Sequence, residues 1–468
     1  MNNINWYEEV LKRKDEQLQL TKQLIQIKSV LDEQCDDANA PLGKEVKEAL
    51  QFLLTQGEKD GFTTKNVDNL AGHLEFGEGE ELVGILCHVD VVPEGDGWTY
   101  DPYGGEIVDR KMYGRGVLDD KGPTIAAYMG MKLIKELRLP LSKRVRMIIG
   151  TDEESDWRCV DRYFQTEEMP TIGFAPDADF PIIYAEKGIA DYDFIFTNEK
   201  CEKKNINLIE FQSGRRYNMV PDFAKAKLEL TMNETNFINE YEQYLKANGL
   251  EGKGYVENEH VTLELIGVSA HGMEPKLGKN AGILLANFLA NYNLDSNGRN
   301  YVQFIHTYFG FDSRGNAFDI AIADQTGELT MNAGVFDYSL ELGGKIGVNM
   351  RYPQSCSIDA TMDNIKNKLK ETTIKIDSFK NSSPHYVKED SELIQTLQRV
   401  YEQQMNEKAE LIAIGGGTYA RSLTQGVAFG PLFPGREDCA HQKDEYMLIE
   451  DLLKSASLYA QAIYELAK

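Results

Sequence analysis

The sequence predicts an α/β domain formed from both ends of the chain and a smaller α+β domain inserted between them. The chain has 468 residues, which is more than one hydrophobic core usually organises. Apolar strand patterns alternate with helical patterns before about Gly188 and again after about Asn381, as is typical of βαβ units. Between these two points, the patterns indicate antiparallel strands separated by polar helices.

The first part of the α/β domain begins with a predicted amphipathic helix from Trp6 to Val30, where apolar residues recur at helical spacing among charges. A strand is expected at 82–92, followed by a helix at 123–137. Further strands are expected at 145–150 and 172–175. This alternation predicts a largely parallel sheet with helices packed on it.

In the insertion, the segments YDFIFTNE, AKAKLELTM and HVTLELIG have the pattern of antiparallel strands. The last part of the chain returns to an apolar strand and a glycine-rich loop in LIAIGGGTYARSL, then VAFGPLFPG, then a helix expected at 444–467. These changes predict domain boundaries that divide the chain into 1–188, 189–382 and 383–468.

Composition excludes several classes of partner. The chain carries 75 acidic and 50 basic residues, a net charge of −25, which argues against binding to nucleic acid or to anionic membranes. The six cysteines are scattered without a C-x-x-C pair, which favours reduced thiols over a disulfide framework. With no apolar signal core near its first residues, the protein is expected to be soluble and cytoplasmic.

The segment CHVDVVPEGDGW (87–98) follows the apolar run LVGIL and places two polar residues at the end of a buried strand. Burying His88 and Asp90 costs free energy unless both have partners. Residues two apart on a strand point to the same face. We therefore expect something at this strand end to stabilise both side chains.

Other strand ends carry the same kinds of residue. They supply Asp119 and Asp120, then Asp152, Glu153 and Glu154, then Asp177 and Asp179, and finally His441. Each has an ordinary structural explanation on its own, such as helix capping by an aspartate or a solvated pair of glutamates. Together they favour a ligand site, because ligands gather at the carboxyl ends of strands in α/β sheets and clustered carboxylates repel unless a cation lies between them.

Mixed imidazole and carboxylate ligands favour zinc, manganese or cobalt over calcium or magnesium. Two histidines and three carboxylates suffice for two ions when one carboxylate bridges them. Such a pair polarises a carbonyl and activates a water molecule. One further carboxylate is needed as a general base, and another orients a ligating imidazole, which is the role we expect for Asp90 beside His88.

Five motifs carry a resemblance to a known family: HVDVVP, YGRGVLDDKGP, GTDEES, PDADFP and GREDCAH, in this order. They resemble those of the two-metal aminoacylase/carboxypeptidase G-like peptidases, and are most similar to the bacterial dipeptidase V type. The likeness extends over essentially the whole chain. It implies an aminopeptidase-like α/β/α catalytic domain with a mixed sheet, formed by 1–188 and 383–468, and an α+β lid domain at 189–382.

The resemblance also implies roles for the clustered residues. His88 and Asp177 would bind one metal, His441 and Glu154 the other, and Asp119, rather than Asp120, would bridge them. Glu153 would be the general base and Asp90 would steer His88. The two divalent ions would be zinc or manganese.

In the insertion, GVSAHGMEP places His271 where the family has a lid histidine that stabilises the tetrahedral intermediate. RYNMVP offers Asn218 and GVNMRYP offers Arg351 for the substrate carboxylate or the oxyanion. Gly415, Gly416 and Gly417 precede a predicted helix, and their backbone N–H groups are suited to binding a carboxylate. The same glycines also suit a tight turn.

The predicted function is therefore a metal-dependent dipeptidase that acts on dipeptides with a free amino terminus. One alternative is an N-acyl amino acid deacylase, which would share every metal ligand. Another is a catalytically inactive binding module, although that class usually lacks a ligand or the base. The long insertion, through the resemblance, predicts a monomer.

Overall fold

The computed structural model describes residues 4–200 and 203–468, and the chain forms two compact units. The first unit combines the residues up to Ala185 with Tyr386–Ile412 and Thr418–Lys468. The second combines Glu186–His385 with Ala413–Gly417. Residues 413–417 thus belong to the second compact unit, whereas the sequence pattern assigned them to the α/β domain. Naming the units catalytic and lid domains stays a prediction.

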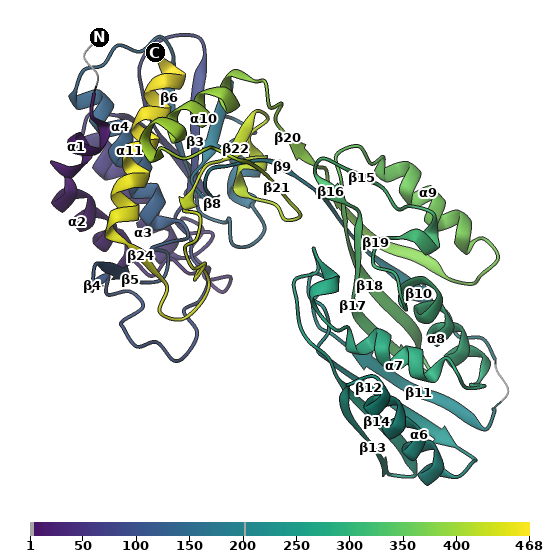
Figure 1. The fold of residues 1–468 in the computed structure, drawn as a ribbon. Coiled ribbons are helices and arrows are strands. Elements are labelled where there is room, and N and C mark those ends of the chain that lie inside the picture. The colour runs from purple at the N-terminus through teal and green to yellow at the C-terminus, as the bar shows by residue number, and fades with distance from the viewer. Residues whose placement is uncertain (1–3, 201–202) are drawn as a thin grey trace. The chain divides into compact units, whose positions relative to one another are not determined.

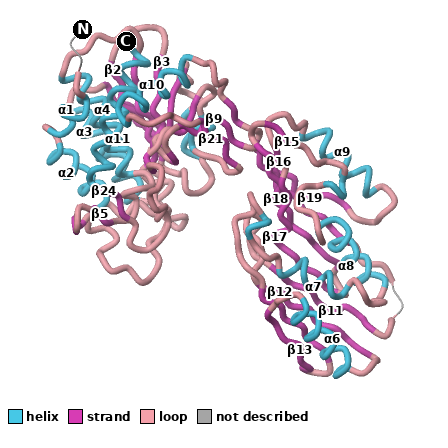
Figure 2. The backbone as a smooth tube through the Cα atoms, in the orientation of Figure 1, coloured by secondary structure: helices cyan, strands magenta, loops and turns pink. Residues whose placement is uncertain are grey.

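The first unit is an α/β structure with a mixed sheet, as predicted (Figures 1 and 2). Its helices are α1 (Trp6–Leu11), α2 (Lys14–Ile25), α3 (Lys44–Lys59), α4 (Lys121–Glu136), α5 (Arg158–Tyr163), α10 (Glu392–Met405), α11 (Ile449–Ala467) and the 3₁₀ turn η3 (Tyr419–Ser422). The main sheet has the order β1 (Thr63–Val67), β2 (Ala71–Phe76), β6 (Arg144–Gly150), β3 (Leu82–His88), β7 (Ile172–Ala175), β22 (Gly426–Ala428), β9 (Ile182–Glu186) and β20 (His385–Tyr386), with β21 (Leu411–Ile414) also paired to β9. Smaller sheets contain β4 (Glu106–Val108), β5 (Lys111–Tyr113), β8 (Ala178–Asp179), β23 (Pro431–Leu432) and β24 (Tyr446–Leu448).

The centre of the main sheet is parallel, because β3 pairs in parallel with both β6 and β7, and β7 pairs in parallel with β22. The strands β1 and β2 and the pair β22–β9 add antiparallel neighbours. All seven residues of β3 are buried. A strand that is buried on both faces reads as a continuous apolar run, which is why LVGIL was recognisable.

Helices cover both faces of this sheet. On β2, Leu74 lies so close to Gly57 of α3 that a Cβ at that glycine would clash with it, whereas the neighbouring His73 contacts Tyr163 of α5. Successive side chains of a strand point to opposite faces, so α3 and α5 lie on opposite faces. The sheet is therefore the middle layer of an α/β/α arrangement.

Helices α4 and α11 pack side by side (Figure 1). Nearly all residues of α4 are buried, so its apolar residues extend around the helix rather than along one stripe. Close packing depends on Gly130, because a Cβ there would lie 2.9 Å from the backbone nitrogen of Ala460 on α11. A larger residue at 130 would force the two helices apart.

Two helix predictions were wrong at their limits. The helix expected from Trp6 to Val30 is divided into α1 and α2, because Arg13 leaves the helical conformation and its N–H donates to Val10 O three residues back (2.8 Å). Its second part ends at Ile25. At the other end of the chain, α11 begins at Ile449 rather than Asp444, because 446–448 form strand β24.

The second unit contains an antiparallel sheet in the order β13 (Glu251–Glu257), β14 (His260–Ile266), β12 (Phe223–Leu230), β11 (Ile206–Ser213), β17 (Thr330–Ser339), β18 (Gly343–Tyr352), β10 (Gly188–Phe196) and β19 (Lys375–Ser382). The three segments predicted as antiparallel strands overlap β10, β12 and β14, and each extends one to three residues beyond the end of its strand. Its remaining elements are α6 (Glu234–Ala247), α7 (Ala281–Leu289), α8 (Ser296–Phe309), α9 (Ile358–Leu369), η1 (Pro275–Leu277), η2 (Asn316–Phe318), β15 (Ala323–Asp324) and β16 (Gly327–Glu328).

The core of the second unit lies between this sheet and its helices. On β12 the buried residues are Ala224, Ala226 and Leu228, which alternate with more exposed ones. They share one face of the strand. Helices α6, α7 and α8 are drawn along this sheet in Figure 1, and they supply Phe237, Leu285 and other buried residues to the same core.

Among the described residues, none of the helices combines the length and apolar character required to cross a bilayer.

Acidification should destabilise the first unit partly through His73. Burial, and then the charge of Arg146, lower the pKa of His73 to about 4, below the ordinary value of about 6.5. Protonation therefore favours the unfolded chain, and the stability that neutral His73 provides above pH 6.5 is lost as the pH falls toward 4. Between pH 7 and pH 5 this loss amounts to about 2 kcal/mol.

Urea unfolding of wild type and His73→Phe at both pH values measures this component. The variant should lose about 2 kcal/mol less than wild type on acidification. Tyr163→Phe is the matched control, because it removes the hydroxyl that contacts His73 Nδ1 and leaves the imidazole in place. The control should keep the wild-type pH dependence, and an identical pH dependence in His73→Phe would disprove the assignment.

Candidate metal centre

Three neighbouring parallel strands deliver polar side chains to one edge of the main sheet. Strand β3 ends at His88, β6 is followed by Glu153 and Glu154, and β7 is followed by Asp177. The order β6–β3–β7 places these strand ends next to each other. Parallel strands end at the same edge, so the topology explains why these residues meet.

The first group of side chains surrounds His88, which is fully buried. Its Nε2 lies 3.0 Å from Asp119 Oδ1 and 3.6 Å from Asp177 Oδ1. Potential ligand atoms of His88, Glu153 and Asp177 all lie within 4.8 Å of one another. This spacing suits a single cation.

The second group surrounds His441, which comes from the loop between β23 and β24. Its Nε2 lies 2.9 Å from Asp119 Oδ2 and 3.0 Å from Glu154 Oε1. Potential ligand atoms of Asp119, Glu154 and His441 also lie within 4.8 Å of one another. The two groups thus bring together residues that are far apart in the sequence.

Asp119 joins the two groups. One of its carboxylate oxygens contacts His88 and the other contacts His441. A carboxylate that offers one oxygen to each of two sites is the arrangement expected of a bridging ligand. The neighbouring Asp120 turns away from this position, and its Oδ2 accepts hydrogen bonds from the backbone N–H of His88 (3.1 Å) and from Thr124 Oγ1 (3.0 Å).

The strand expected at 82–92 ends at His88, so Asp90 lies beyond it. Three contacts still connect it with the site. His88 Nδ1 lies 3.4 Å from Asp90 Oδ1 and 3.1 Å from the backbone oxygen of Asp90. Asp90 Oδ2 accepts a hydrogen bond from the backbone N–H of Glu154 (3.0 Å). Asp90 therefore contacts one residue of each group, His88 in the first and Glu154 in the second.

The pKa values of the site reflect carboxylates that are both buried and close together. Burial, and then the negative charge of Asp177, raise the pKa of Glu153 well above its ordinary value. Burial and then Asp119 raise the pKa of Glu154. Burial raises the pKa of Asp177 to about 7, although His88 opposes this shift. Each shift reflects mainly the cost of removing a carboxylate from water, to which the neighbouring negative charges add.

The two histidines relieve part of this repulsion. Burial disfavours the charged form of His88, but Asp177 and Asp119 raise its pKa well above the ordinary value. Hydrogen bonds to Asp119 and Glu154 raise the pKa of His441 to about 11. A divalent cation provides the same compensation without protons, and nitrogen and carboxylate oxygen donors suit zinc or manganese. The donor set therefore fits two such ions.

Glu445 is a buried residue of this region that sequence reasoning missed. Its Oε1 accepts hydrogen bonds from the backbone N–H groups of Gly116 (3.0 Å), Leu118 (2.9 Å) and Asp119 (3.3 Å). Its Oε2 contacts Arg115 Nη1 at 2.5 Å. Glu445 thus fixes the loop that carries Asp119. In the sequence it is one more acidic residue of a polar loop, and no pattern distinguishes it.

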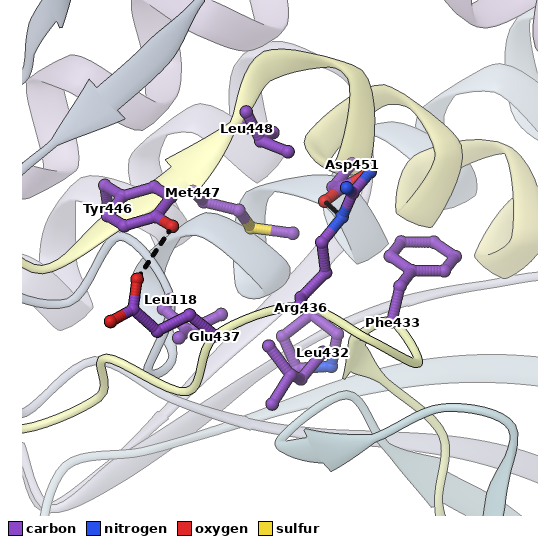
Figure 3. A pocket seen from close by; sticks show the side chains of 10 residues that line it. Leu118, Leu432, Phe433, Arg436, Glu437, Tyr446, Met447, Leu448 and Asp451 are labelled. Carbon is purple, nitrogen blue, oxygen red and sulfur yellow. Dashed lines mark hydrogen bonds and ion pairs between the residues drawn. The ribbon is translucent and has the colours of Figure 1, made fainter.

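The loop that carries His441 is anchored away from the ligand groups. Arg436 pairs with Asp451 of α11 through two contacts of 2.7 and 3.0 Å, and Tyr446 donates to Glu437 (3.2 Å), as Figure 3 shows. These side chains line a pocket with Leu118, which precedes Asp119. None of the predicted ligands lines this pocket. Its residues therefore hold the loops that carry Asp119 and His441 and do not contribute ligand atoms.

The second unit holds the other predicted site residues. Asn218 and His271 lie on two loops joined by a hydrogen bond from Gly272 N to Asn218 O (2.7 Å). Arg351, on β18, is buried and donates to Asn349 Oδ1 (2.8 Å) and to Gly415 O (3.2 Å). Burial, and then the charge of Arg351, lower the pKa of His271. These residues therefore form one polar region within this unit.

Gly415, Gly416 and Gly417 follow β21, but the helix expected after them is the short 3₁₀ turn η3 at Tyr419–Ser422. Such a turn has few aligned peptide dipoles, so the helix N-terminus proposed for carboxylate binding is absent from this part of the described chain. A role of the glycines in substrate binding stays a prediction that rests on the loop alone.

An α/β sheet edge at which two histidine–carboxylate groups meet is the type of site that a metallohydrolase uses. Residues 84–465 match the peptidase family M20/M25/M40. The chain belongs to this family, and it is therefore an enzyme of the M20 metallopeptidases.

Among proteins with similar sequences, one from Bacillus subtilis (strain 168) named "Putative dipeptidase YtjP" is 51% identical over 468 residues, which cover 99% of this chain and 100% of the relative. One from Staphylococcus epidermidis (strain ATCC 12228 / FDA PCI 1200) named "Putative dipeptidase" is 42% identical over 464 residues, 98% of this chain and 99% of the relative.

Two solved structures show the same fold at low identity. Aminopeptidase PepT from Bacillus cereus ATCC 10987 has a TM-score of 0.58 and 15% identity, with 97% of this chain and 99% of that chain covered. Human carnosine dipeptidase 1 has a TM-score of 0.56 and 15% identity, with 98% of each chain covered.

The two groups predict how metal content responds to substitution. His88→Ala and His441→Ala should each reduce bound zinc or manganese from about two ions to about one, because each removes a ligand from one group. Asp119→Ala should weaken both sites, because its carboxylate contacts both histidines. Mass spectrometry of the metal content after dialysis measures the ratio.

His260→Ala on β14 is the matched control, since it removes an imidazole outside both groups and should keep the wild-type metal content. Retention of both ions at wild-type affinity by Asp119→Ala would refute the bridging role.

Proposed function

We propose that this chain is a dipeptidase that hydrolyses dipeptides with a free amino terminus, with two divalent cations and Glu153 as the general base. The observation that carries the proposal is the carboxylate of Asp119, whose two oxygens contact the histidines of two separate ligand groups. The names of the Bacillus and Staphylococcus relatives support the reaction class.

The proposed ligands of one ion are His88 and Asp177, and those of the other are His441 and Glu154, with Asp119 shared. The ions are zinc or manganese, because both accept imidazole and carboxylate ligands. When bound, such a pair supplies Lewis-acid polarisation of the substrate carbonyl and acidifies the attacking water.

Glu153 is proposed to take the proton of that water and pass it to the leaving amine. Its carboxylate lies in the first group but is not needed to complete a His88, Asp177 and Asp119 ligand set. The raised pKa of Glu153 suits a group that accepts a proton and later donates it. Asp90 is proposed to orient His88 through Nδ1, which leaves Nε2 toward Asp119 and Asp177.

His271 is proposed to stabilise the oxyanion of the tetrahedral intermediate as a neutral donor. Its Nδ1 accepts a hydrogen bond from the backbone N–H of Met273 (3.1 Å). A neutral imidazole with an accepting Nδ1 carries its hydrogen on Nε2. The lowered pKa of His271 keeps this tautomer neutral over a wider pH range, so Nε2–H remains a donor.

The substrate's own charges define the remaining contacts. Arg351 is proposed to bind the terminal carboxylate, because a guanidinium forms directional hydrogen bonds to carboxylates. Asn218 and the loop Gly415–Gly417 are proposed to support the same end of the substrate. Asp177 or its acidic neighbours are proposed to bind the free amino group.

We retain the cytoplasm and a monomer as the proposed location and assembly. The described cysteines Cys35, Cys87, Cys159, Cys356 and Cys439 are all unpaired, which is compatible with a reducing compartment. The monomer rests on the resemblance of the long insertion to the dipeptidase V type.

A panel of dipeptides tests the substrate class. After metal removal and readdition of zinc or manganese, the protein should cleave dipeptides with a free amino group, whereas N-acetylated versions should lose about 100-fold or more in kcat/KM. The loss is expected because blocking the amine leaves buried acidic groups of the enzyme unpaired. Comparable or faster cleavage of N-acyl amino acids would favour the deacylase, and no hydrolysis of either class would favour a binding module.

Glu153→Gln tests the base. This nearly isosteric change should lower kcat by about 10²–10⁴-fold, because the amide cannot accept the proton. The metal content should stay at the wild-type value, which separates a base from a ligand. Asp156→Asn changes an exposed carboxylate of the same turn and should leave both quantities unchanged. Substantial activity in Glu153→Gln, or loss of an ion, would reject the assigned role.

A further inference from the structure

Met273 has a fixed backbone on the loop that carries His271. Its N–H donates to His271 Nδ1 (3.1 Å), and its carbonyl oxygen accepts from Thr330 Oγ1 on β17 (3.0 Å). The next residue, Glu274, donates its N–H to His271 O (3.1 Å) and pairs through its carboxylate with Arg314 at 2.9 and 3.0 Å. The position of the Met273 Cα is therefore well defined.

The side chain of Met273, in contrast, is not enclosed. It is 39% exposed, which is unusual for a large apolar residue next to polar site residues. It lies against Gly415, where an added Cβ would be 3.3 Å from Met273 Cβ and 3.6 Å from its Cγ and Sδ. The thioether thus forms an apolar surface directly beside the glycine loop.

Gly415 also contacts Arg351. Gly415 O accepts a hydrogen bond from Arg351 Nη1 (3.2 Å). The guanidinium is oriented further by Asn349, which accepts from Arg351 Nε (2.8 Å) and itself donates to Asp191 (2.6 Å). Gly415 therefore contacts both Met273 and Arg351, the residue proposed to bind the substrate carboxylate.

The covalent geometry of a dipeptide indicates which part of the substrate would lie beside Met273. In a dipeptide, the terminal carboxylate and the C-terminal side chain are attached to the same carbon atom, which is separated from the scissile carbonyl only by the amide nitrogen. A residue between the carboxylate-binding Arg351 and the oxyanion-binding His271 therefore faces the C-terminal side chain. The backbone N–H of Met273 contacts His271, and its side chain lies beside Gly415, whose carbonyl oxygen accepts from Arg351.

We propose that Met273 is a specificity-determining residue that selects dipeptides with an apolar C-terminal side chain, an inference that rests on the proposed dipeptidase function. The charged neighbours support an apolar subsite, because Arg314 pairs with both Glu274 and Glu328 and is thus compensated. Methionine is flexible and polarisable, so the subsite accepts leucine, methionine and phenylalanine rather than one shape.

Two pairs of dipeptides measure this preference. Wild type should favour Ala-Leu over Ala-Asn by about tenfold in kcat/KM, because leucine and asparagine are similar in size and differ in polarity. Met273→Gln should reduce this ratio at least about fivefold, because the amide makes the wall polar, and Met273→Leu should retain the ratio within about twofold. The ratio for Leu-Ala over Asn-Ala, which varies the amino-terminal residue, should not change in either variant.

Leu277→Gln is the matched control. Leu277 is an apolar residue of the same loop region, is 77% exposed and lies outside the proposed subsite, so both ratios should stay at wild-type values. Thermal unfolding and metal content of each variant verify that the fold and the ligand groups are unchanged.

The outcomes separate this inference from the proposed function. Hydrolysis of dipeptides with an Ala-Leu over Ala-Asn ratio that Met273→Gln does not alter would overturn the role of Met273 alone. A change confined to the Leu-Ala over Asn-Ala ratio would also overturn it, by assigning Met273 to the amino-terminal side chain. Failure of wild type to hydrolyse any free dipeptide would overturn the proposed function, and this inference with it.

Discussion

The free-energy cost of burying several carboxylates together is the constraint on which the arrangement of the candidate site depends. Glu153, Glu154 and Asp177 meet at one sheet edge, and burial, followed by the charges of neighbouring carboxylates, raises the pKa of all three. The parallel strands β3, β6 and β7 impose this proximity. Asp119 contributes a further charge that both histidines stabilise. Such a site is compatible with a stable fold only when cations or protons offset the charge.

The sequence permitted prediction of residues whose position follows from strand topology. His88 ends one apolar strand and Asp177 follows another, and the parallel order of those strands brings them together. Asp119 was distinguished from Asp120 only by a family motif, since both precede the same helix. Glu445 could not be predicted, because its partners are backbone N–H groups of a loop more than 300 residues away, as the separations of 326 to 329 positions show. Every residue except proline has a backbone N–H group, so such partners cannot be recognised from residue types in the sequence.

The first and last residues of helices and strands were harder to predict, because they depend on the conformation of single residues. The division between α1 and α2 depends on the conformation of Arg13, and periodicity continues across it. Likewise, apolar spacing does not distinguish the short strand β24 from the first turn of α11. The prediction of a helix after Gly417 assumed that a glycine loop leads into regular structure, but the chain makes a 3₁₀ turn there. Such details depend on hydrogen bonds to distant segments.

The loop between β23 and β24 has a consequence for the order in which the site forms. It supplies His441 to the second ligand group and Glu445 to the loop of Asp119. A folding intermediate that contains β3, β6 and β7 but not this loop therefore lacks one histidine of the second group and the acceptor that holds the loop of Asp119. The two groups of side chains are complete only when the residues that follow β23 have joined the fold.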